Sequence, residues 1–288
     1  LIGDREGEGH FRLAIDRSFS VQGAGLVVTG GVFSGKVNVG DHLTLSPQGI
    51  DVRVRGIHAQ NKESEAGVSG QRCALNITGA DLKSTEVHRG GWLVANDIHA
   101  PVARFDARLR VLKSEARPLR HWTPVHVHLG AAEVPGRIAN LEKKSIEPGK
   151  SGLVQVVLDR KIGALKNDSF IIRDQSAQRT IAGGVIIDPF SPARGRAKPE
   201  RIVFLNAMEM KKAEQALEKL LNQMPMGVNL SLFSKAWNLT KAERDSVFDS
   251  IKMIKIITDK NEVGLLPESF DMIGSMTYDA LQKWHINN

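Results

Sequence analysis

The first residues able to do chemistry are an arginine and an aspartate in an apolar strand. Phe11, Leu13 and Ile15 alternate with small or polar neighbours, the pattern of a strand that buries one face. Arg17 continues that apolar face, where a guanidinium is stranded unless a partner or an anionic ligand meets it. Two alternatives stay open: a β-bulge that turns Arg17 back to water, or an ion pair between Arg17 and Asp16.

Two histidines and one cysteine could also bind metal or react, but their surroundings predict otherwise. His126 and His128 stand two residues apart and so share one face of a strand. A zinc site needs three or four ligands, and neither a cysteine nor an H-x-x-x-H pair accompanies them. Cys73 belongs to an alternating apolar face, and no His–Asp pair is placed to activate it. We expect no metal site, partly buried histidines that form hydrogen bonds or lie near phosphates, and an unreactive cysteine.

No phosphate-binding loop of the form G-x-x-x-x-G-K-[ST] occurs in the sequence. The nearest approach is Gly149–Ser151, but Lys144 stands where the first glycine of the motif belongs, and no long helix is expected after it. Gly23 and Gly25 likewise lack the βαβ unit that a dinucleotide fingerprint requires. We therefore expect that this chain does not hydrolyse GTP by itself and is not an enzyme in its own right.

The composition favours a cytoplasmic protein that meets a polyanion. The single cysteine excludes an internal disulfide and suits a reducing compartment. No apolar run approaches the ~20 residues of a membrane span, so no membrane partner is expected. The net charge of +7 points to nucleic acid. Aromatic residues make up only 5% of the chain, which argues against a base-stacking single-strand binder and favours contacts with phosphates.

Short strands joined by tight turns are expected over the first two thirds of the 288 residues. From Phe11 to about Asn96, β-branched runs alternate with polar residues between glycine-containing turns, as in a small antiparallel barrel. Pro101 opens a second stretch of the same kind, which continues to Phe170–Pro189. The fold class is therefore mainly β, with two barrels in succession.

Beyond a basic linker at Ser191–Pro199 the hydrophobic period changes from two to about 3.6. The pattern predicts one long or broken helix from Phe204 to Leu221, a short helix at Asn229–Trp237, and a capped helix that starts at Thr240–Glu243. A hairpin at 254–266 follows, and 267–288 begins another helix. Three helices and a β-wing form a winged-helix module, which binds nucleic acid or serves as a spacer.

Five segments resemble one family of translation factors. GAGLVVTGGVFSGKVNVGDHL (23–43) resembles the opening of the second domain of translational GTPases. AIDRSF (14–19), HAQN (58–61) and GQRCALN (70–76) narrow the likeness to bacterial selenocysteine-specific elongation factors. The end of the second β stretch, FIIRDQSAQRTIAGGVIIDP, resembles the last strands of elongation factor domain III. The resemblance implies barrels of domain II and domain III type, followed by winged helices.

The resemblance also implies two binding sites. The family's selenocysteine pocket maps onto Asp16, Arg17 and Arg72. A selenol is more acidic than a thiol, whose pKa is ~8.5, so the selenocysteyl side chain arrives as an anion. Two guanidinium groups would hold this anion, and Asp16 would orient Arg17 or meet the α-amino group. The family's contacts with the T arm of the tRNA map onto three residues of IRDQSAQRT, namely Arg173, Arg179 and Thr180. For Arg173, a solvated turn residue is an equally good interpretation.

The expected domains follow from these two lines of inference. They are a linker remnant at 1–10, a domain II-like barrel at 11–98, a domain III-like barrel at 99–190, a basic linker at 191–201, a winged helix at 202–268 and the start of a truncated second winged helix at 269–288. In the family a GTP-binding domain, with GTP and Mg, precedes the barrels. Further winged helices grip the messenger-RNA hairpin and follow the part that this chain represents.

The function that the resemblance implies is delivery of selenocysteyl-tRNA to the ribosome at recoded UGA codons, with this chain as the part that binds the tRNA and its amino acid. One alternative is the pair of tRNA-binding barrels of another translational GTPase. The other is a winged-helix protein that binds nucleic acid or a protein partner and catalyses nothing. The first winged helix of the family is a spacer, which makes base reading by this one the weaker expectation.

Overall fold

The computed structural model describes residues 8–23, 25–259 and 261–287. It divides into two compact units, the first ending at Arg196 and the second beginning at Ala197, inside the segment expected to be a linker. Of the linker expected at 1–10, only residues 8–10 lie within the described part. None of the helices in the described ranges is long and apolar enough to cross a membrane.

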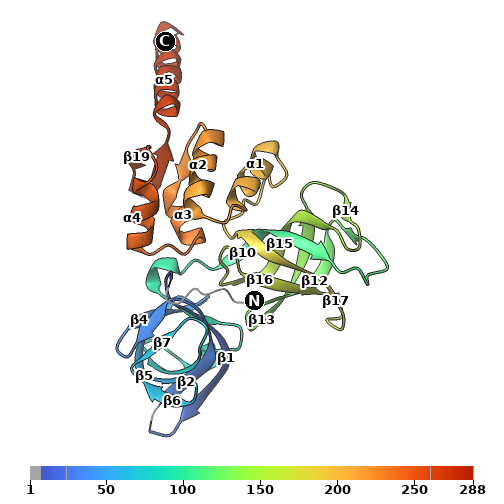
Figure 1. Ribbon diagram of the computed structural model, residues 1–288, viewed down its shortest axis with the longest axis vertical. Helices are drawn as coiled ribbons and strands as arrows, with labels where there is room; N and C mark the ends of the chain where they lie inside the picture. The colour runs from blue at the N-terminus through green and yellow to red at the C-terminus, as the bar shows by residue number, and fades with distance from the viewer. Residues whose placement is uncertain (1–7, 24, 260, 288) are drawn as a thin grey trace. The chain divides into compact units, whose positions relative to one another are not determined.

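The first unit begins with a closed antiparallel barrel (Figure 1). Its ring runs β4-β9-β1-β2-β8-β5 and closes through pairing of β5 with β4. The ring strands are β1 (Arg12–Val21), β2 (Gly25–Ser34), β4 (His42–Ser46), β5 (Ile50–Ala59), β8 (Arg72–Thr78) and β9 (Trp92–Val94). Shorter elements accompany them, namely β3 (Lys36–Asn38), β6 (Lys62–Ser64), β7 (Ala66–Val68) and the 3₁₀ turns η1 (Ser84–Glu86) and η2 (Asn96–Ile98).

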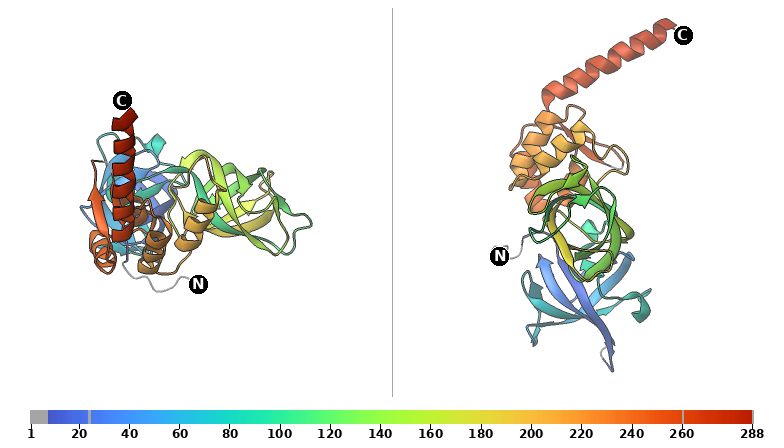
Figure 2. Two further views of the ribbon diagram at one scale, coloured as in Figure 1. Left: turned by 90° about the horizontal axis from the view of Figure 1, so that it is seen from above. Right: turned by 90° about the vertical axis from the view of Figure 1, so that its right-hand side faces the viewer.

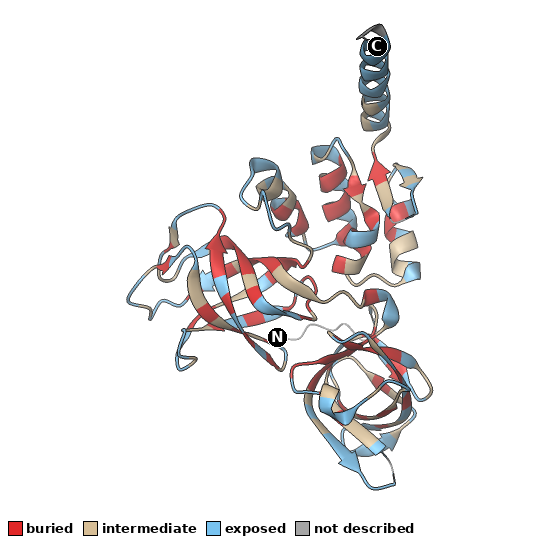
Figure 3. Ribbon diagram, turned by 180° about the vertical axis from the view of Figure 1, so that it is seen from behind, coloured by how far each residue is buried: buried red, intermediate tan, exposed pale blue. Residues whose placement is uncertain are grey.

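The turn between β3 and β4 shows why this sequence forms tight connections. Gly40 has a φ of +98°, a conformation that costs glycine little. The carboxylate of Asp41 accepts a hydrogen bond of 2.7 Å from the backbone N–H of Asn38, which fixes the turn. The alternating apolar residues expected from the sequence then point inward, and Leu13, Val54 and Leu75 are among the buried core. Figure 3 shows in red where buried residues lie along the strands.

The second barrel follows in the same unit and is also closed, in the order β10-β15-β13-β12-β16-β17. Phe105 and Phe170 meet edge to face in its core, with ring centroids 5.2 Å apart. Its strands are β10 (Val102–Val111), β12 (Thr123–Leu129), β13 (Ala132–Asn140), β15 (Ser151–Ile162), β16 (Ser169–Arg173) and β17 (Thr180–Asp188), with β11 (Leu119–Arg120) and β14 (Ser145–Ile146) paired beside it. Figure 2 shows both barrels from two further sides.

A buried junction joins the two barrels. Arg12 of β1 donates two hydrogen bonds, of 2.8 and 2.6 Å, to the carboxylate of Asp168, which precedes β16. Trp92 of β9 lies under the guanidinium, with its ring centroid 4.6 Å from Cζ of Arg12. Gly163 leaves room for this indole, because a Cβ there would lie 2.9 Å from the ring. Ala14 and Trp92 belong to the core of the second barrel, so the first barrel supplies part of that core.

The second unit is α+β. Its three-stranded sheet has the order β18-β20-β19, and the helices α2, α3 and α4 precede or separate its strands. The bounds are α1 (Pro199–Met208), α2 (Ala213–Gln223), β18 (Val228–Asn229), α3 (Leu230–Ala236), α4 (Lys241–Asp249), β19 (Ile254–Ile257), β20 (Glu262–Leu265) and α5 (Pro267–Asn287). For the pattern from Phe204 to Leu221, the broken helix is the alternative that occurs, as the two helices α1 and α2.

The capping box expected at Thr240 is confirmed. The backbone N–H of Thr240 donates to the Glu243 carboxylate at 2.7 Å, and the Thr240 hydroxyl accepts from the N–H of Glu243 at 3.4 Å, so α4 begins at Lys241. Asn229 caps α3 in the same manner, since its side chain accepts from the N–H of Leu232. α5 is one continuous helix (Figure 2).

Candidate functional site

A β-bulge in β1 decides how the residues expected at the site are arranged. Ile15 pairs with Gly30 and Arg17 with Thr29, so Asp16 is the extra residue on its strand. The expectation that Arg17 extends the buried face of Phe11, Leu13 and Ile15 is wrong. Of the two alternatives left open, the bulge is the one that occurs, because it shifts the alternation by one residue and exposes Arg17.

Asp16 forms an ion pair with Arg72 rather than with its neighbour Arg17. Nη1 of Arg72 donates to Oδ2 of Asp16, and Nη2 donates to Oδ1 at 3.0 Å. Thr29 stands between them, because its hydroxyl donates to Oδ1 of Asp16 at 2.7 Å and accepts from Nη2 of Arg72 at 3.2 Å. The three residues come from the adjacent strands β1, β2 and β8. We call this group the Asp16 cluster.

The electrostatics of the Asp16 cluster keep the carboxylate ionised. Hydrogen bonding from Arg72 holds the pKa of Asp16 below its usual value of 3.8, and the Thr29 hydroxyl and the charge of Arg17 act in the same direction. Partial burial opposes these effects without cancelling them. The bond to Asp16 in turn raises the pKa of Arg72. The cluster is therefore a fixed pair of charges with an exposed guanidinium outward.

A cavity of about 630 Å³ adjoins the Asp16 cluster on the outer surface of the first barrel. Phe19 and Val21 of β1, Thr29 and Val27 of β2, and Ala74 and Asn76 of β8 line its floor. Side chains two residues apart share one face of a strand. Arg17 precedes Phe19 by two residues, and Arg72 precedes Ala74 by two. The two arginines that the resemblance maps to one pocket therefore lie next to Thr29 of this floor, although neither is among the residues that line the cavity.

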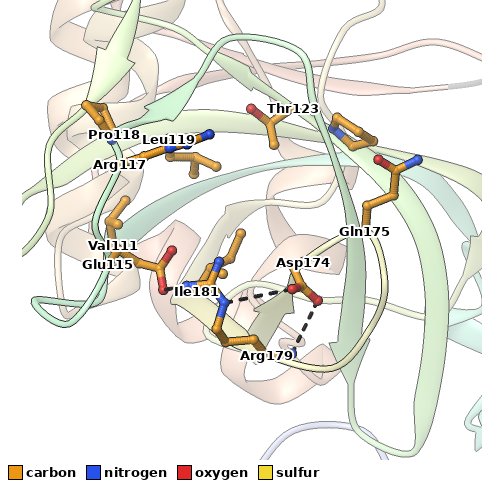
Figure 4. A pocket seen from close by; sticks show the side chains of 11 residues that line it. Val111, Glu115, Arg117, Pro118, Leu119, Thr123, Asp174, Gln175, Arg179 and Ile181 are labelled. Carbon is orange, nitrogen blue, oxygen red and sulfur yellow. Dashed lines mark hydrogen bonds and ion pairs between the residues drawn. The ribbon is translucent and has the colours of Figure 1, made fainter.

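A smaller cavity of about 270 Å³ lies on the second barrel, between the segment 111–124 and the β16–β17 hairpin (Figure 4). Arg179 enters it and donates to Glu115 at 2.6 Å, and its Nε lies 3.8 Å from the Asp174 carboxylate. The hairpin is ordered by Asp174, whose carboxylate accepts from the backbone N–H groups of Arg179 and Gln178. These backbone bonds lower the pKa of Asp174.

The three residues mapped to the tRNA site differ in how far their side chains are already engaged in ion pairs and hydrogen bonds within the protein. Two carboxylates already neutralise the charge of Arg179. Arg173 donates to the backbone oxygen of Gln178 at 3.0 Å and so helps to close the hairpin. Thr180, the first residue of β17, is exposed. All three lie on one hairpin, as the sequence led us to expect.

His126 and His128 are half-buried on β12, and Cys73 lies in the core of the first barrel. Nδ1 of His126 lies 3.1 Å from the Glu133 carboxylate, and burial lowers the pKa of His128. Cys73 is a free thiol buried in the first barrel, and burial raises its pKa. Within the described ranges, no group of three or more His, Cys, Asp or Glu side chains could hold a metal ion.

Sequence reasoning missed two residues near the site. Thr29 gave no chemical signal, because a threonine in a β-branched run is ordinary; only its position opposite the bulge gives its hydroxyl a role. Arg12 was expected on the polar face of its strand. It is only 5% exposed, since the second barrel covers that face. The sequence of β1 alone does not predict that the second barrel covers this face.

Comparison with known proteins agrees with this architecture. Residues 25–94 match the family described as elongation factor Tu domain 2, and residues 106–193 match the β-barrel domain of the selenocysteine-specific elongation factor. The selenocysteine-specific elongation factor of Escherichia coli K12 is 39% identical over 230 residues, which are 80% of this chain and 35% of that protein. The Haemophilus influenzae protein of the same name is 38% identical over 210 residues, which are 73% of this chain and 33% of that protein.

Solved structures extend the likeness of fold. A bacterial selenocysteine-specific elongation factor superposes with a TM-score of 0.73 at 19% identity, covering 100% of this chain and 44% of that one. The apo form of the Methanococcus maripaludis factor gives a TM-score of 0.54 at 23% identity, covering 62% of this chain and 43% of the other. At these identities the structures establish the fold alone.

The two closed barrels, matched to translation-factor families, define an elongation factor of the Tu type in its barrel portion. More narrowly, the chain belongs to the family of selenocysteine-specific elongation factors. It spans about a third of the length of the curated relatives that it matches.

Proposed function

We propose that this chain is the part of a selenocysteine-specific elongation factor that holds selenocysteyl-tRNA for delivery to the ribosome. The observation that carries the proposal is the Asp16 cluster, in which a carboxylate fixes Arg72 beside Thr29, and Thr29 also lines the cavity on the first barrel. The apolar floor suits the flat end of an aminoacylated nucleotide, and the cationic end suits an anionic amino-acid side chain.

The chemistry of discrimination follows from charge. A selenol ionises more readily than a thiol, so the selenocysteyl side chain is an anion at neutral pH, while the serine ester of the same tRNA is neutral. Asp16 uses one edge of the Arg72 guanidinium, whose five N–H donors leave others for a ligand. Arg17 is exposed and adds a second positive charge. Asp16 would thus orient Arg72, where the resemblance implied that it orients Arg17 or meets the α-amino group.

The second barrel would hold the helical part of the same tRNA by phosphate contacts. Thr180 offers an exposed hydroxyl, and Arg173 and Arg179 border the same hairpin. Because Glu115 and Asp174 already pair with Arg179, a phosphate would have to compete for that guanidinium. We therefore assign Arg179 a smaller share of the affinity than its position in the sequence suggested.

We propose that β18–β20 with α2, α3 and α4 form a winged helix that acts as a spacer. The order helix, strand, helix, helix, hairpin supports the winged-helix assignment. α4 takes the position of a recognition helix, yet Arg244 pairs with Asp245, and Lys255 of the wing pairs with Asp249. Cations already paired with carboxylates on that face do not suit a phosphate backbone.

GTP chemistry is not assigned to these residues. Relatives of this kind belong to a family of translational GTPases, with GTP and Mg as its cofactors, but this sequence lacks the phosphate-binding loop that such a site requires. The barrels are therefore assigned binding and orientation of the tRNA only.

The test is binding of this chain to selenocysteyl-tRNA and to the same tRNA charged with serine, measured at two salt concentrations. We expect the selenocysteyl form to bind more tightly, and Arg72→Ala to reduce that preference by about tenfold, as expected for loss of a charge-assisted contact worth roughly 1.5 kcal/mol. Binding of both forms should weaken with salt, with a log–log slope of roughly −0.7 to −0.9 per phosphate contact.

Arg89→Ala is the matched control, because Arg89 is an exposed arginine of the same barrel that is not part of the Asp16 cluster. It should leave the selenocysteyl preference unchanged. Equal discrimination in the parent chain and in Arg72→Ala would remove Arg72 from the site. A salt-independent affinity would rule out the phosphate contacts of the second barrel.

A further inference from the structure

An exposed tryptophan on the second barrel stands among several basic side chains. Trp122, just before β12, is 42% exposed. His121 stacks beside it, with ring centroids 6.0 Å apart and planes 28° apart, and Cζ of Arg196 lies 5.5 Å from the indole centroid. We call Arg120, His121, Trp122, Arg137 and Arg196 the Trp122 cluster.

The backbone around Trp122 adopts an unusual conformation that hydrogen bonds hold in place. Trp122 has a φ of +67°, an outlier for a bulky side chain. Its N–H donates to the carbonyl oxygen of Ile138 at 2.6 Å, and its own carbonyl oxygen accepts from Arg137 at 3.5 Å. Thr123 fixes the other side of the turn by donating to the carbonyl oxygen of Arg120 at 2.8 Å. The ring is therefore anchored by its backbone while its side chain meets solvent.

The charges of the cluster are available to a ligand. In the part of the chain that the structure describes, Arg120, Arg137 and Arg196 form no ion pair with a carboxylate. Arg120 and Arg137 are exposed, whereas Arg196 is half-buried and its Nη1 has no hydrogen-bond acceptor among those residues. By contrast, Arg179, in the cavity of the same barrel, is paired twice. A phosphate could therefore supply the negative charge that these arginines do not receive from a carboxylate of the described residues.

We propose that the Trp122 cluster binds an unpaired nucleotide of RNA, with the base stacked on Trp122 and its phosphates against Arg120, Arg137 and Arg196. A base in a helical stem has both faces covered by its neighbours, so only a splayed-out base reaches an aromatic ring on a protein surface. An acidic peptide would meet the arginines but would gain little from the indole. The low aromatic content disfavoured base stacking across the chain, yet one side chain suffices for one base.

The proposal rests on the proposed function only in taking this chain to bind RNA. It does not depend on the amino acid that the RNA carries. Its test therefore uses uncharged probes: a fluorescently labelled single strand of eight adenylates, a blunt duplex of eight A–U pairs, and a peptide of eight glutamates. Binding of each to the full chain is measured by anisotropy at one salt concentration.

We expect Trp122→Leu to weaken binding of the single strand by about 5- to 150-fold, the range for loss of one stacked base, and to leave duplex binding within about twofold. Trp122→Phe should retain most of the affinity, because a phenyl ring still stacks. Arg137→Gln should weaken both nucleic acids and reduce the salt slope by roughly one contact. Trp284→Leu, which removes another exposed tryptophan on α5, is the control and should change nothing.

Several results would overturn the proposal. Unchanged single-strand binding in Trp122→Leu would make Trp122 only a contact for Arg196. Equal weakening of single strand and duplex would mean that the change acts through the fold, and thermal unfolding of the variant would register that. Tight binding of the glutamate peptide, independent of Trp122, would make the cluster a protein contact. If the parent chain shows no preference for selenocysteyl-tRNA while Trp122→Leu still weakens single-strand binding, the proposed function alone is refuted.

Discussion

At the scale of single residues, the Asp16 cluster couples stability to pH. Arg72 lowers the pKa of Asp16 in the folded chain, whereas an unfolded aspartate titrates near ~3.9. Below that pH the unfolded chain takes up the proton more readily than the folded chain does. The stabilisation is therefore complete above about pH 4 and is lost as the pH falls through the lower folded pKa.

We expect Asp16→Asn to reduce this acid-dependent loss of stability. Urea unfolding at pH 7 and at about pH 3 should give a smaller difference in the free energy of unfolding for the variant than for the parent chain. Asp51→Asn is the control, because Asp51 is an exposed aspartate of the same barrel that lies outside the Asp16 cluster. Identical pH dependence in Asp16→Asn and the parent would show that the pair with Arg72 does not hold the carboxylate ionised.

How far single residues could be predicted depended on what lies outside their own strand. Asp16, Arg17 and Arg72 were expected near one another, and the structure does bring Asp16 and Arg72 together. The bulge was one of the alternatives, but alternation alone cannot place an extra residue, because period two continues equally well on either face. The buried position of Arg12 depends on the second barrel, which β1 does not encode.

At the scale of elements, two adjacent glycines of β2 have opposite roles. A Cβ on Gly30 would lie 1.9 Å from the carbonyl oxygen of Ala14, so β1 and β2 approach each other only because the side chain is absent. A Cβ on Gly31 would meet nothing within 4 Å. The same dipeptide thus contains one position that the pairing requires and one that it does not.

Gly30→Ala should therefore lower the free energy of unfolding by at least about 1–3 kcal/mol, the usual cost of overpacking. Gly31→Ala should be neutral or stabilise by about 0.4–1 kcal/mol, because it restricts the unfolded chain. Chemical unfolding followed by circular dichroism measures both. A loss in Gly31→Ala as large as that in Gly30→Ala would mean that the strand tolerates no side chain at either position, for reasons other than contact with Ala14.

Elements were predicted best where local chemistry determines them. The strands of both barrels followed from alternation and glycine turns, and α4 followed from its capping box at Thr240. The pattern from Phe204 to Leu221 did not show its break. α1 ends at Met208 and α2 starts at Ala213, and the residues between them, Glu209–Lys212, include no glycine or proline that would mark a stop.

At the scale of the first unit, the pair between Arg12 and Asp168 joins the two barrels. Both side chains are 6% exposed. Removing one partner of a buried ion pair leaves the other charge uncompensated, which costs about 3–5 kcal/mol. Asp168→Asn should lower the free energy of unfolding by that amount, while it keeps an oxygen to accept the N–H of Leu165. Urea unfolding followed by tryptophan fluorescence measures the change.

The double variant Arg12→Met, Asp168→Asn distinguishes the cost of an unpaired buried charge from the cost of a disturbed loop before β16. It removes the unpaired guanidinium and fills its place with an apolar chain, so it should recover most of the stability lost in Asp168→Asn. If the double variant is as unstable as the single one, the loss arises from the loop before β16 and not from a stranded charge.

The same junction also sets an order of events during synthesis. Trp92 and Arg12 leave the ribosome well before Asp168, which is made 76 residues after Trp92. At the usual pace of translation that gap lasts about 4–15 s. During this interval the first barrel can close, but the Trp92 indole and the Arg12 guanidinium remain exposed on the face that the second barrel will cover. A stall in translation between these two residues would therefore prolong the exposure of this face of the first barrel.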